Sequence, residues 1–335
     1  MFYLRKNATF FASFLSDFTH LAEKIVHKKI RLVSSNRGNV CFSVGSSEKN
    51  ETTIGALFEH WRHKFEIEAI SEPVASTEHI VAHVLGTTRI SDIYRLKKTP
   101  LTATQIVQID ALCSQRLKHV PVQYILGEWS FRHLTLKMSA PVFIPRPETE
   151  QLVDIILPEI VRKDFHILDL CCGSGAIALS LLQEQDTIKA TGVDQSEAAC
   201  QLTKENAQRN GLNKRIRIIQ SQLERWNCEE KFDLVVSNPP YVFTEDMEHL
   251  QKEIKLYEDP RALDGGAQGL SVIKTILSIS SRCLDKNGKL FLEVDPRHPP
   301  PLSIYLLKNN TLGLAHVETY PDFSGKRRFV QIIKK

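Results

Sequence analysis

The stretch VVSNPPYVF at residues 235–243 places an amide side chain, two prolines and an aromatic ring directly after an apolar run. The Asn238 side chain and the Pro239 carbonyl can accept hydrogen bonds, and the prolines carry no N–H group that competes for these acceptors. A planar NH2 group, with two hydrogens to donate and a flat face for a ring, suits this pattern. The sequence therefore predicts a site for such a group, formed by Asn238, Pro239, Pro240 and Tyr241. The alternative is an ordinary rigid turn after a strand.

A turn of small residues follows an earlier apolar run, HILDL at residues 166–170. Such a turn lets the backbone approach a ligand closely and begins a helix beneath it, as in enzymes that bind dinucleotides or methyl donors. Asp169 would repel a pyrophosphate, so the turn favours S-adenosylmethionine, which is a cation, over a nicotinamide dinucleotide. The predicted cofactor-binding residues of this turn are Asp169, Cys171, Cys172, Gly173, Ser174 and Gly175.

Two further apolar runs end in polar residues that suit the same cofactor. Asp194 ends the run IKATGVD, and its carboxylate can accept hydrogen bonds from both hydroxyl groups of a ribose. Gln222 and Leu223 follow the next run, where methyl-donor enzymes often carry an acid that holds the adenine amino group. Gln222 can accept that bond only through its amide oxygen. Asp169 and Asp194 could instead cap helices, but two acids that flank one glycine turn favour the cofactor site.

A stiff segment, FIPRPETE at residues 143–150, precedes these runs. We expect Phe143 and Arg146 to form a wall of the site, because a stiff segment that enters the sheet domain is well placed to cover the cofactor. The alternative is a rigid linker before a helix whose first turn carries the acids Glu148 and Glu150.

These candidate residues need a scaffold that brings distant parts of the chain together. After residue 145, apolar runs that resemble strands alternate with stretches of helical periodicity. This alternation predicts an α/β domain with a doubly wound, mainly parallel sheet. Strands are expected at 166–170, 188–194, 215–220, 232–238, 288–294, 316–320 and 328–333, and helices at 174–185, 196–210, 269–284 and 302–309. Ligands bind such sheets at the carboxyl ends of the strands, so Asn238 is expected to contact both cofactor and substrate.

The segments before the sheet domain contain no clustered chemistry. Residues 52–127 carry apolar residues at helical spacing, with Thr77 and Thr102 as expected helix starts, and predict a small helical bundle. Residues 128–144 alternate like strands and predict a hairpin that links the bundle to the sheet domain at 145–335.

Residues 1–47 differ in composition from the rest of the chain. They contain seven Lys or Arg, two acids and several Ser, which is typical of a mitochondrial transit peptide and predicts a location in the matrix. The alternative is an ordinary basic amphipathic helix. No window of the sequence approaches the 18 apolar residues that a membrane span needs, so no membrane is expected as a partner. The seven cysteines lack the paired spacing of metal ligands, so no metal site is expected.

Five segments occur in a characteristic order along the chain: FIPRPETEQLVD, DLCCGSGAIALSL, GVD, VVSNPPYV and YEDPRALDGGAQGLSVI. Together they resemble the HemK/PrmC family of protein-glutamine N5-methyltransferases. The resemblance implies a class I S-adenosylmethionine-dependent methyltransferase domain with a Rossmann-like sheet, preceded by a helical bundle that recognises the substrate. Two departures stand out, because the family usually has Gly-Thr at Cys171 and Cys172 and often has Asp at Gln222.

The resemblance also implies a reaction and a partner. The methyl group of S-adenosylmethionine would be transferred, without a metal, to the side-chain amide nitrogen of the glutamine in the Gly-Gly-Gln motif of class I peptide-chain release factors. This modification supports translation termination. With a transit peptide at residues 1–47, the mitochondrial release factors become the expected partners.

Two alternatives to this function are open at the level of sequence. An N6-adenine DNA or RNA methyltransferase shares the Asn-Pro-Pro-Tyr form but needs a basic groove. Residues 48–335 carry a net charge of −1, which argues against extensive nucleic-acid binding. A non-catalytic adaptor that holds the release factor is the second alternative, and the intact Asn238 and Asp194 argue against it.

Overall fold

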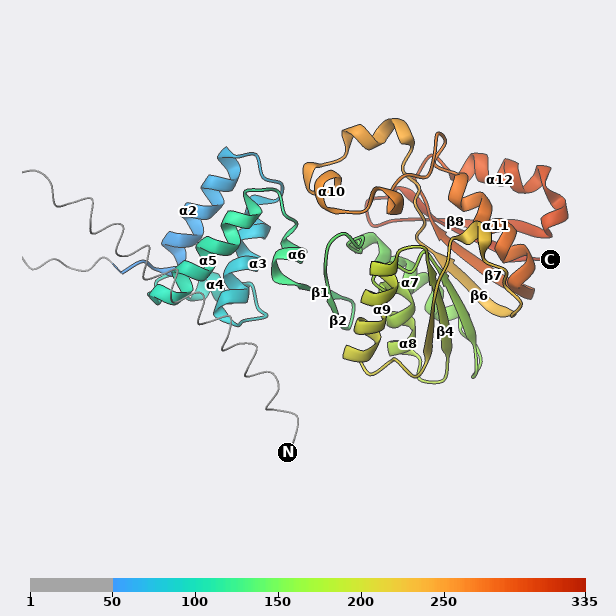
Figure 1. The fold of residues 1–335 in the computed structure, drawn as a ribbon, viewed down its shortest axis with the longest axis horizontal. Helices are drawn as coiled ribbons and strands as arrows, with labels where there is room; N and C mark the ends of the chain where they lie inside the picture. The colour runs from blue at the N-terminus through green and yellow to red at the C-terminus, as the bar shows by residue number, and fades with distance from the viewer. Residues whose placement is uncertain (1–50) are drawn as a thin grey trace, which may run out of the picture. The chain divides into compact units, whose positions relative to one another are not determined.

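The computed structural model describes residues 51–335 (Figure 1). The predicted transit peptide at 1–47 lies outside the described residues. Within the part of the chain that is described, no helix has the length and the apolar content that crossing a membrane requires.

The helical periodicity of residues 52–127 corresponds to a group of short helices. They are α2 (Ile54–Ile67), α3 (Pro73–Leu85), α4 (Ser91–Arg95), α5 (Ala103–Arg116) and α6 (Val122–Leu126). The large apolar residues of α2 recur at helical spacing and lie on one face, so Phe58, Trp61 and Phe65 are buried together. They share a core with Ile80 of α3 and Ile109 of α5, separate from the cores of the sheet.

One of the two predicted helix starts is confirmed and one is wrong. Thr102 begins α5 with a reciprocal cap: its hydroxyl accepts from the Gln105 N–H at 3.2 Å, and the Gln105 side chain accepts from the Thr102 N–H at 3.0 Å. Thr77 lies inside α3, which already begins at Pro73. A proline suits the first position of a helix, and the Thr77 hydroxyl donates back to the Pro73 carbonyl at 2.8 Å instead of capping.

A hairpin follows the helices. Strands β1 (Glu128–Phe131) and β2 (Leu134–Lys137) pair antiparallel, with Phe131 opposite Leu134. The alternating pattern that suggested strands up to residue 144 ends as pairing at Lys137, and the chain then runs without regular structure to α7 (Pro147–Ile156).

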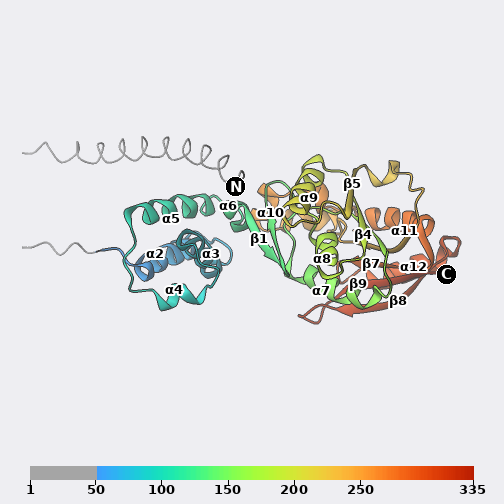
Figure 2. The same ribbon diagram turned by 90° about the horizontal axis from the view of Figure 1, so that it is seen from below.

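The predicted fold class is confirmed by a seven-stranded sheet in the order β5-β4-β3-β6-β7-β9-β8. Its strands are β3 (His166–Leu170), β4 (Lys189–Asp194), β5 (Ile216–Gln220), β6 (Phe232–Ser237), β7 (Leu284–Glu293), β8 (Leu314–Pro321) and β9 (Arg327–Lys334). The five strands from β5 to β7 are parallel, and β9 pairs antiparallel with both β7 and β8. Figure 2 shows these last two strands, in red, at one side of the sheet.

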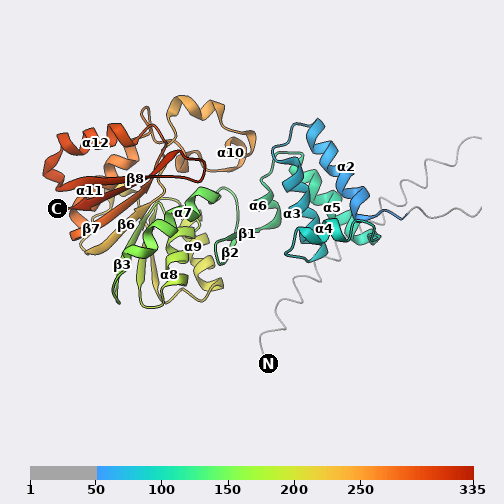
Figure 3. The same cartoon turned by 180° about the vertical axis from the view of Figure 1, so that it is seen from behind.

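Helices cover both faces of this sheet (Figure 3). They are α7, α8 (Ala176–Glu184) and α9 (Glu197–Arg209), then α11 (Ser271–Cys283) and α12 (Pro299–Lys308), with a short α10 (Lys252–Tyr257) in a connection. Successive strand residues point to opposite faces, so Ile167 joins the core with α7, α8 and α9, whereas Leu168 and Leu170 join the core with α11 and α12. Short 3-10 turns complete the connections: η1 (Leu157–Glu159), η2 (Leu223–Arg225), η3 (Thr244–His249), η4 (Pro260–Ala262) and η5 (Asn310–Leu312).

The strand order reverses between β3 and β6. From β3 the chain builds β4 and β5 on one side and then returns to add β6 and β7 on the other. The loops after β3 and β6 therefore diverge from neighbouring strand ends, which is where open α/β sheets form their ligand sites.

Candidate active site

A cavity of about 310 Å³ lies at the carboxyl ends of the parallel strands. It brings together most of the residues that the sequence predicts for a site, from five separate segments. These are Phe143, Arg146, Cys171, Cys172, Gly173, Ser174, Asp194, Leu223, Asn238, Pro239, Pro240 and Tyr241. Three other predicted residues do not line it: Asp169 lies buried beneath the turn, Gly175 begins α8, and Gln222 is exposed. Glu224, two residues further along, does line the cavity.

The turn between β3 and α8 is held open by contacts from two other segments. Both oxygens of the Asp194 carboxylate accept from backbone N–H groups at 2.9 Å, one from Gly173 and one from Ser196. The Thr203 hydroxyl donates to the Gly173 carbonyl at 2.8 Å. Asp194 is thus fixed at the mouth of the turn, with a lone pair on each oxygen left to accept a further hydrogen bond. Burial raises its pKa, although the two N–H groups oppose that shift.

Asp169 is a buried carboxyl group with one oxygen satisfied. Its Oδ2 accepts from the Ala178 N–H at 3.2 Å, whereas Oδ1 has no hydrogen-bond partner among residues 51–335. Burial raises the pKa of Asp169 to about 8. A carboxyl oxygen without a partner beneath an open turn fits a ligand that brings positive charge, because a nearby cation favours the ionised form.

The Asn-Pro-Pro-Tyr loop is anchored from beneath. The Ser237 hydroxyl donates to the Leu170 carbonyl at 2.5 Å, which ties the end of β6 to the end of β3. The Asn238 Nδ2 group donates to the Thr149 hydroxyl at 3.3 Å, and the Tyr241 hydroxyl donates to Glu293 at 3.2 Å. Burial raises the pKa of the Tyr241 hydroxyl, so this group stays protonated. Asn238 and Tyr241 are therefore held by side chains that the Asn-Pro-Pro-Tyr motif does not contain.

Phe143 and Arg146 line the cavity, and a residue at the end of α10 holds Arg146 in place. The Arg146 guanidinium donates to both oxygens of Glu258, at 2.7 and 2.9 Å, and lies over the Phe143 ring at 4.7 Å. Burial raises the pKa of Glu258, and the Arg146 charge opposes that shift. The pair holds the segment after α10 against the segment before α7.

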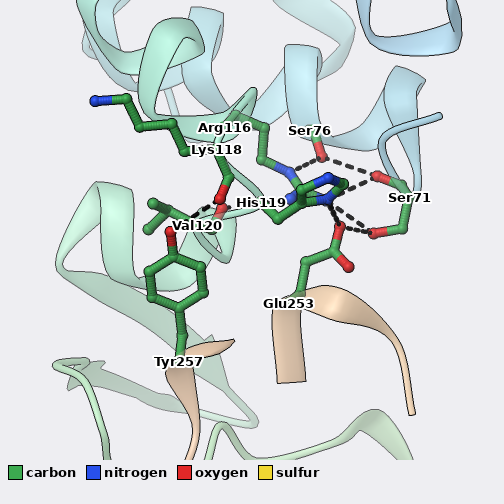
Figure 4. A network of polar contacts seen from close by, with 8 residues as sticks. All are labelled: Ser71, Ser76, Arg116, Lys118, His119, Val120, Glu253 and Tyr257. Atoms are coloured by element: carbon green, nitrogen blue, oxygen red, sulfur yellow. Dashed lines mark hydrogen bonds and ion pairs between the residues drawn. The ribbon is translucent and has the colours of Figure 1, made fainter. Parts of the chain in front are cut away.

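The beginning of α10 is held by residues from the group of helices at 52–127. Leu250 and Ile254 line the cavity, and between them Glu253 accepts from Arg116 at 3.0 Å and from the Ser71 hydroxyl at 2.8 Å. Figure 4 shows the Arg116 guanidinium directed toward Glu253, with Ser76 also within its reach. Arg116 is 3% exposed. One wall of the cavity thus rests on a buried ion pair with a residue from α5.

Comparison with known proteins places this geometry in a family. Residues 147–263 match the family model described as Methyltransferase small domain, and residues 56–127 match the PrmC N-terminal domain. The MTRF1L release factor glutamine methyltransferase of Homo sapiens is 47% identical over 293 residues, which cover 82% of this chain and 86% of that protein. A release factor glutamine methyltransferase of Thermodesulfovibrio yellowstonii is 33% identical over 273 residues, 80% of this chain and 95% of that one. The chain belongs to the release factor glutamine methyltransferase family.

The predicted family and the predicted enzyme class are confirmed by these matches. Among solved structures, a methyltransferase from Pyrococcus furiosus aligns with a TM-score of 0.46 and 18% identity, over 66% of this chain and 98% of that one.

Four polar residues of this release factor glutamine methyltransferase site were missed by sequence reasoning: Thr149, Glu253, Glu258 and Glu293. Glu293 had a usable signal, because an acid stands inside the apolar strand GKLFLEV, where a charge needs a reason. Thr149 stands within the quoted PETE segment but gives no signal of its own. Glu258 stands within the quoted YEDPRALDGGAQGLSVI segment, but neither it nor Glu253 gives a signal of its own. Their partners Arg146 and Arg116 lie more than a hundred residues away.

Proposed function

We propose that this protein transfers the methyl group of S-adenosylmethionine to the side-chain amide nitrogen of the glutamine in the Gly-Gly-Gln motif of class I peptide-chain release factors. One observation carries the proposal: a single cavity is lined both by the turn after β3 with Asp194 and by Asn238, Pro239 and Tyr241. The first set suits the cofactor and the second suits a planar amide. Membership of the release factor glutamine methyltransferase family supports the same substrate.

The residues around the turn fit the cofactor in charge and in shape. Asp194 would hold the ribose, and Gly173, Ser174 and Leu223 would line the nucleoside. S-adenosylmethionine, when bound, supplies a methyl group on a positively charged sulfur. We expect no metal to take part, because that methyl group is already activated. Among residues 51–335, no group of three or more His, Cys, Asp and Glu side chains is arranged to hold a metal ion.

The chain's own contribution is to position the amide nitrogen. A glutamine amide is a poor nucleophile, because its lone pair is delocalised into the carbonyl, so orientation must supply much of the rate. The Asn238 Oδ1 and the Pro239 carbonyl would each accept one hydrogen of the substrate amide. Within the described residues no backbone N–H bonds to the Pro239 carbonyl, so that acceptor is open. Tyr241 would pack its ring on the flat amide and exclude water.

The expected location is the mitochondrial matrix, and the expected substrates are the mitochondrial release factors. The support is the composition of residues 1–47, with seven basic and two acidic residues. The net charge of −1 over residues 48–335 supports a protein substrate over a long stretch of DNA or RNA.

Labelled S-adenosylmethionine tests the substrate directly. The full chain is incubated with a mitochondrial class I release factor and, in parallel, with a version whose Gly-Gly-Gln glutamine is replaced by alanine. Label is expected in the first protein alone. Equal labelling of both would exclude the glutamine, labelling of nucleic acid instead would favour the adenine methyltransferase, and binding without any labelling would favour the adaptor.

Replacing the central amide tests the role of the loop. Asn238→Ala should lower kcat by about 100-fold, the typical effect of losing one positioned polar group, while the Kd for S-adenosylmethionine changes little. Asn213→Ala removes an exposed asparagine elsewhere and should leave both constants unchanged. Unchanged turnover in Asn238→Ala would show that the substrate amide is not held there.

A further inference from the structure

We infer that Thr149 and Glu293 are positioning residues, which determine whether the oxygen or the nitrogen of the Asn238 amide faces the substrate. The inference rests on the proposed function. It concerns two residues that lie outside the Asn-Pro-Pro-Tyr motif and come from different elements, Thr149 from α7 and Glu293 from the end of β7.

The three side chains form a continuous line of hydrogen bonds. The Asn238 Nδ2 lies 3.3 Å from the Thr149 Oγ1, and the Thr149 Oγ1 lies 2.8 Å from the Glu293 Oε2. Thr149 is 2% exposed and Glu293 is 1% exposed, so water cannot readily replace either partner. Asn238 lines the cavity at one end of this line, and a buried carboxyl group forms the other end.

The orientation of the Asn238 amide follows from which of these groups can donate a hydrogen bond and which can only accept one. An ionised carboxylate can only accept, so the single hydrogen of the Thr149 hydroxyl must go to Glu293. The Thr149 oxygen then has only lone pairs left for Asn238, and the Asn238 NH2 group must face it. The Asn238 Oδ1 is consequently directed away from Thr149, where it can accept a hydrogen from a substrate amide.

The opposite arrangement would disable the site. If Glu293 is protonated, it can donate to Thr149, and the Thr149 hydrogen becomes free to turn toward Asn238. The Asn238 oxygen is then drawn to Thr149 and its NH2 group faces the cavity. Two NH2 groups cannot hydrogen-bond each other productively, so a glutamine amide would lose one of its acceptors.

The same carboxylate also holds the aromatic ring of the site. The Tyr241 hydroxyl donates to the Glu293 Oε1 at 3.2 Å, on the oxygen that Thr149 does not use. The backbone of Glu293 is fixed by pairing with Phe329 on β9. Glu293 therefore holds Asn238 through Thr149 and holds Tyr241 directly.

Burial and the charges around Glu293 determine the pH above which this series of hydrogen bonds orients Asn238. Burial raises the pKa of Glu293 to about 7, with a further rise from Glu148 on α7. Thr149, Tyr241 and Arg328 on β9 oppose the rise, and Arg328 is itself bound to Asp322 at 2.9 Å. Arg146 acts on the nearby Tyr241 hydroxyl. The ionised fraction of Glu293 increases as pH rises, so kcat should increase through about pH 7.

Two substitutions at Thr149 separate the hydroxyl from the shape of the side chain. Thr149→Val keeps the shape and removes the hydroxyl, and it should lower kcat about tenfold, as expected for loss of a hydrogen bond to a charged group. The Kd for S-adenosylmethionine should stay the same. Thr149→Ser keeps the hydroxyl and should retain most of kcat. Thr191→Val removes another buried threonine hydroxyl, on β4 and away from the cavity, and should leave kcat and its pH dependence unchanged.

A substitution at Glu293 tests the pH dependence. Glu293→Gln should abolish the rise of kcat through about pH 7, because glutamine does not titrate, and should hold kcat low since its NH2 group can donate to Thr149. If Glu293→Gln does not fold, the inference is tested by the pH profile of wild-type kcat and by the comparison of Thr149→Val with Thr149→Ser.

The outcomes distinguish this inference from the proposed function. If Thr149→Val keeps wild-type kcat and pH profile while the wild type labels the release factor, the positioning role is overturned and the function stands. Equal losses in Thr149→Val and Thr149→Ser would also overturn it, because the hydroxyl would not be the group that matters. A wild-type protein that labels no release factor would contradict the proposed function itself.

Discussion

Asp169 is a buried acid of the candidate site whose ionisation would lower the stability of the folded protein. Its carboxyl group is buried with one oxygen lacking a partner in residues 51–335, and its pKa is raised to about 8. In the folded protein it holds a proton at pH values where a free aspartate, with a pKa of about 3.9, has lost it. The bound proton removes a negative charge that would otherwise be buried.

This imbalance predicts a pH-dependent stability. The pKa of Asp169 is higher in the folded state than in the unfolded state. Its favourable contribution to the free energy of unfolding is therefore complete below about pH 4 and is lost as pH rises through about 8. Thermal unfolding measured from pH 5 to about 9 should show this loss, and Asp169→Asn should flatten it. Saturating S-adenosylmethionine should reduce the loss, because positive charge near Asp169 favours the ionised form. A pH dependence unaltered by Asp169→Asn would contradict this assignment.

At the scale of elements, the turn from β3 into α8 depends on unusual backbone conformations. Gly173 and Gly175 have φ values of 57° and 83°, in the left-handed region that favours glycine. Cys171, where the family usually has glycine, adopts φ 63° as well. At Gly175 the turn also packs closely, since an added Cβ would lie 2.7 Å from the Thr203 Cγ2.

The crowding at Gly175 predicts a larger effect than backbone strain alone. Gly175→Ala should lower the free energy of unfolding by about 1–2 kcal/mol because alanine disfavours the left-handed backbone conformation. Overpacking of the added methyl group should lower it by about 1–3 kcal/mol more. It should also weaken S-adenosylmethionine binding, because Thr203 supports Gly173. Gly211→Ala is the matched control: φ is 72°, but an added Cβ meets nothing within 4 Å. Denaturant titration and cofactor titration check both variants, and equal effects would contradict the role of packing.

The elements that sequence predicts well are those determined by local patterns. β6 is a largely apolar run and β4 a short buried one, and the polar residues at their ends suffice to predict that Asp194 and Asn238 lie at one edge of the sheet. The connection from Thr244 to Tyr257 was not predicted, because its position depends on Glu253 meeting Arg116 across 137 residues. Glu293 could have been noticed as an acid inside an apolar strand, but its role could not be predicted, since its two donors come from α7 and the loop after β6.

At the scale of the whole molecule, the pair between Arg116 and Glu253 joins two segments with separate apolar cores. The side chains are 4% and 11% exposed. Arg116→Met leaves a buried carboxylate without its cation and should lower the free energy of unfolding by about 3–5 kcal/mol. Since Leu250 and Ile254 flank Glu253 and line the cavity, KM for the release factor should rise as well.

A double variant tests whether the two residues act as a pair. Arg116→Met combined with Glu253→Met should be less destabilised than the sum of the single variants, because no charge is left buried alone. Arg62→Met breaks an exposed pair with Glu66 within α2 and should change stability little. Additive losses in the double variant, measured by denaturant unfolding, would contradict the pairing.

The position of β9 between β7 and β8 has a consequence for the order in which the sheet assembles. β9 follows β8 in the chain, yet among the described strands it is the one that pairs with both β7 and β8. A folding chain in which β9 has not yet paired therefore presents the open edge of β7, which is covered in the folded protein. Open strand edges of this kind can pair with other chains. The stage before β9 pairs is thus the one at which this protein would depend most on chaperones.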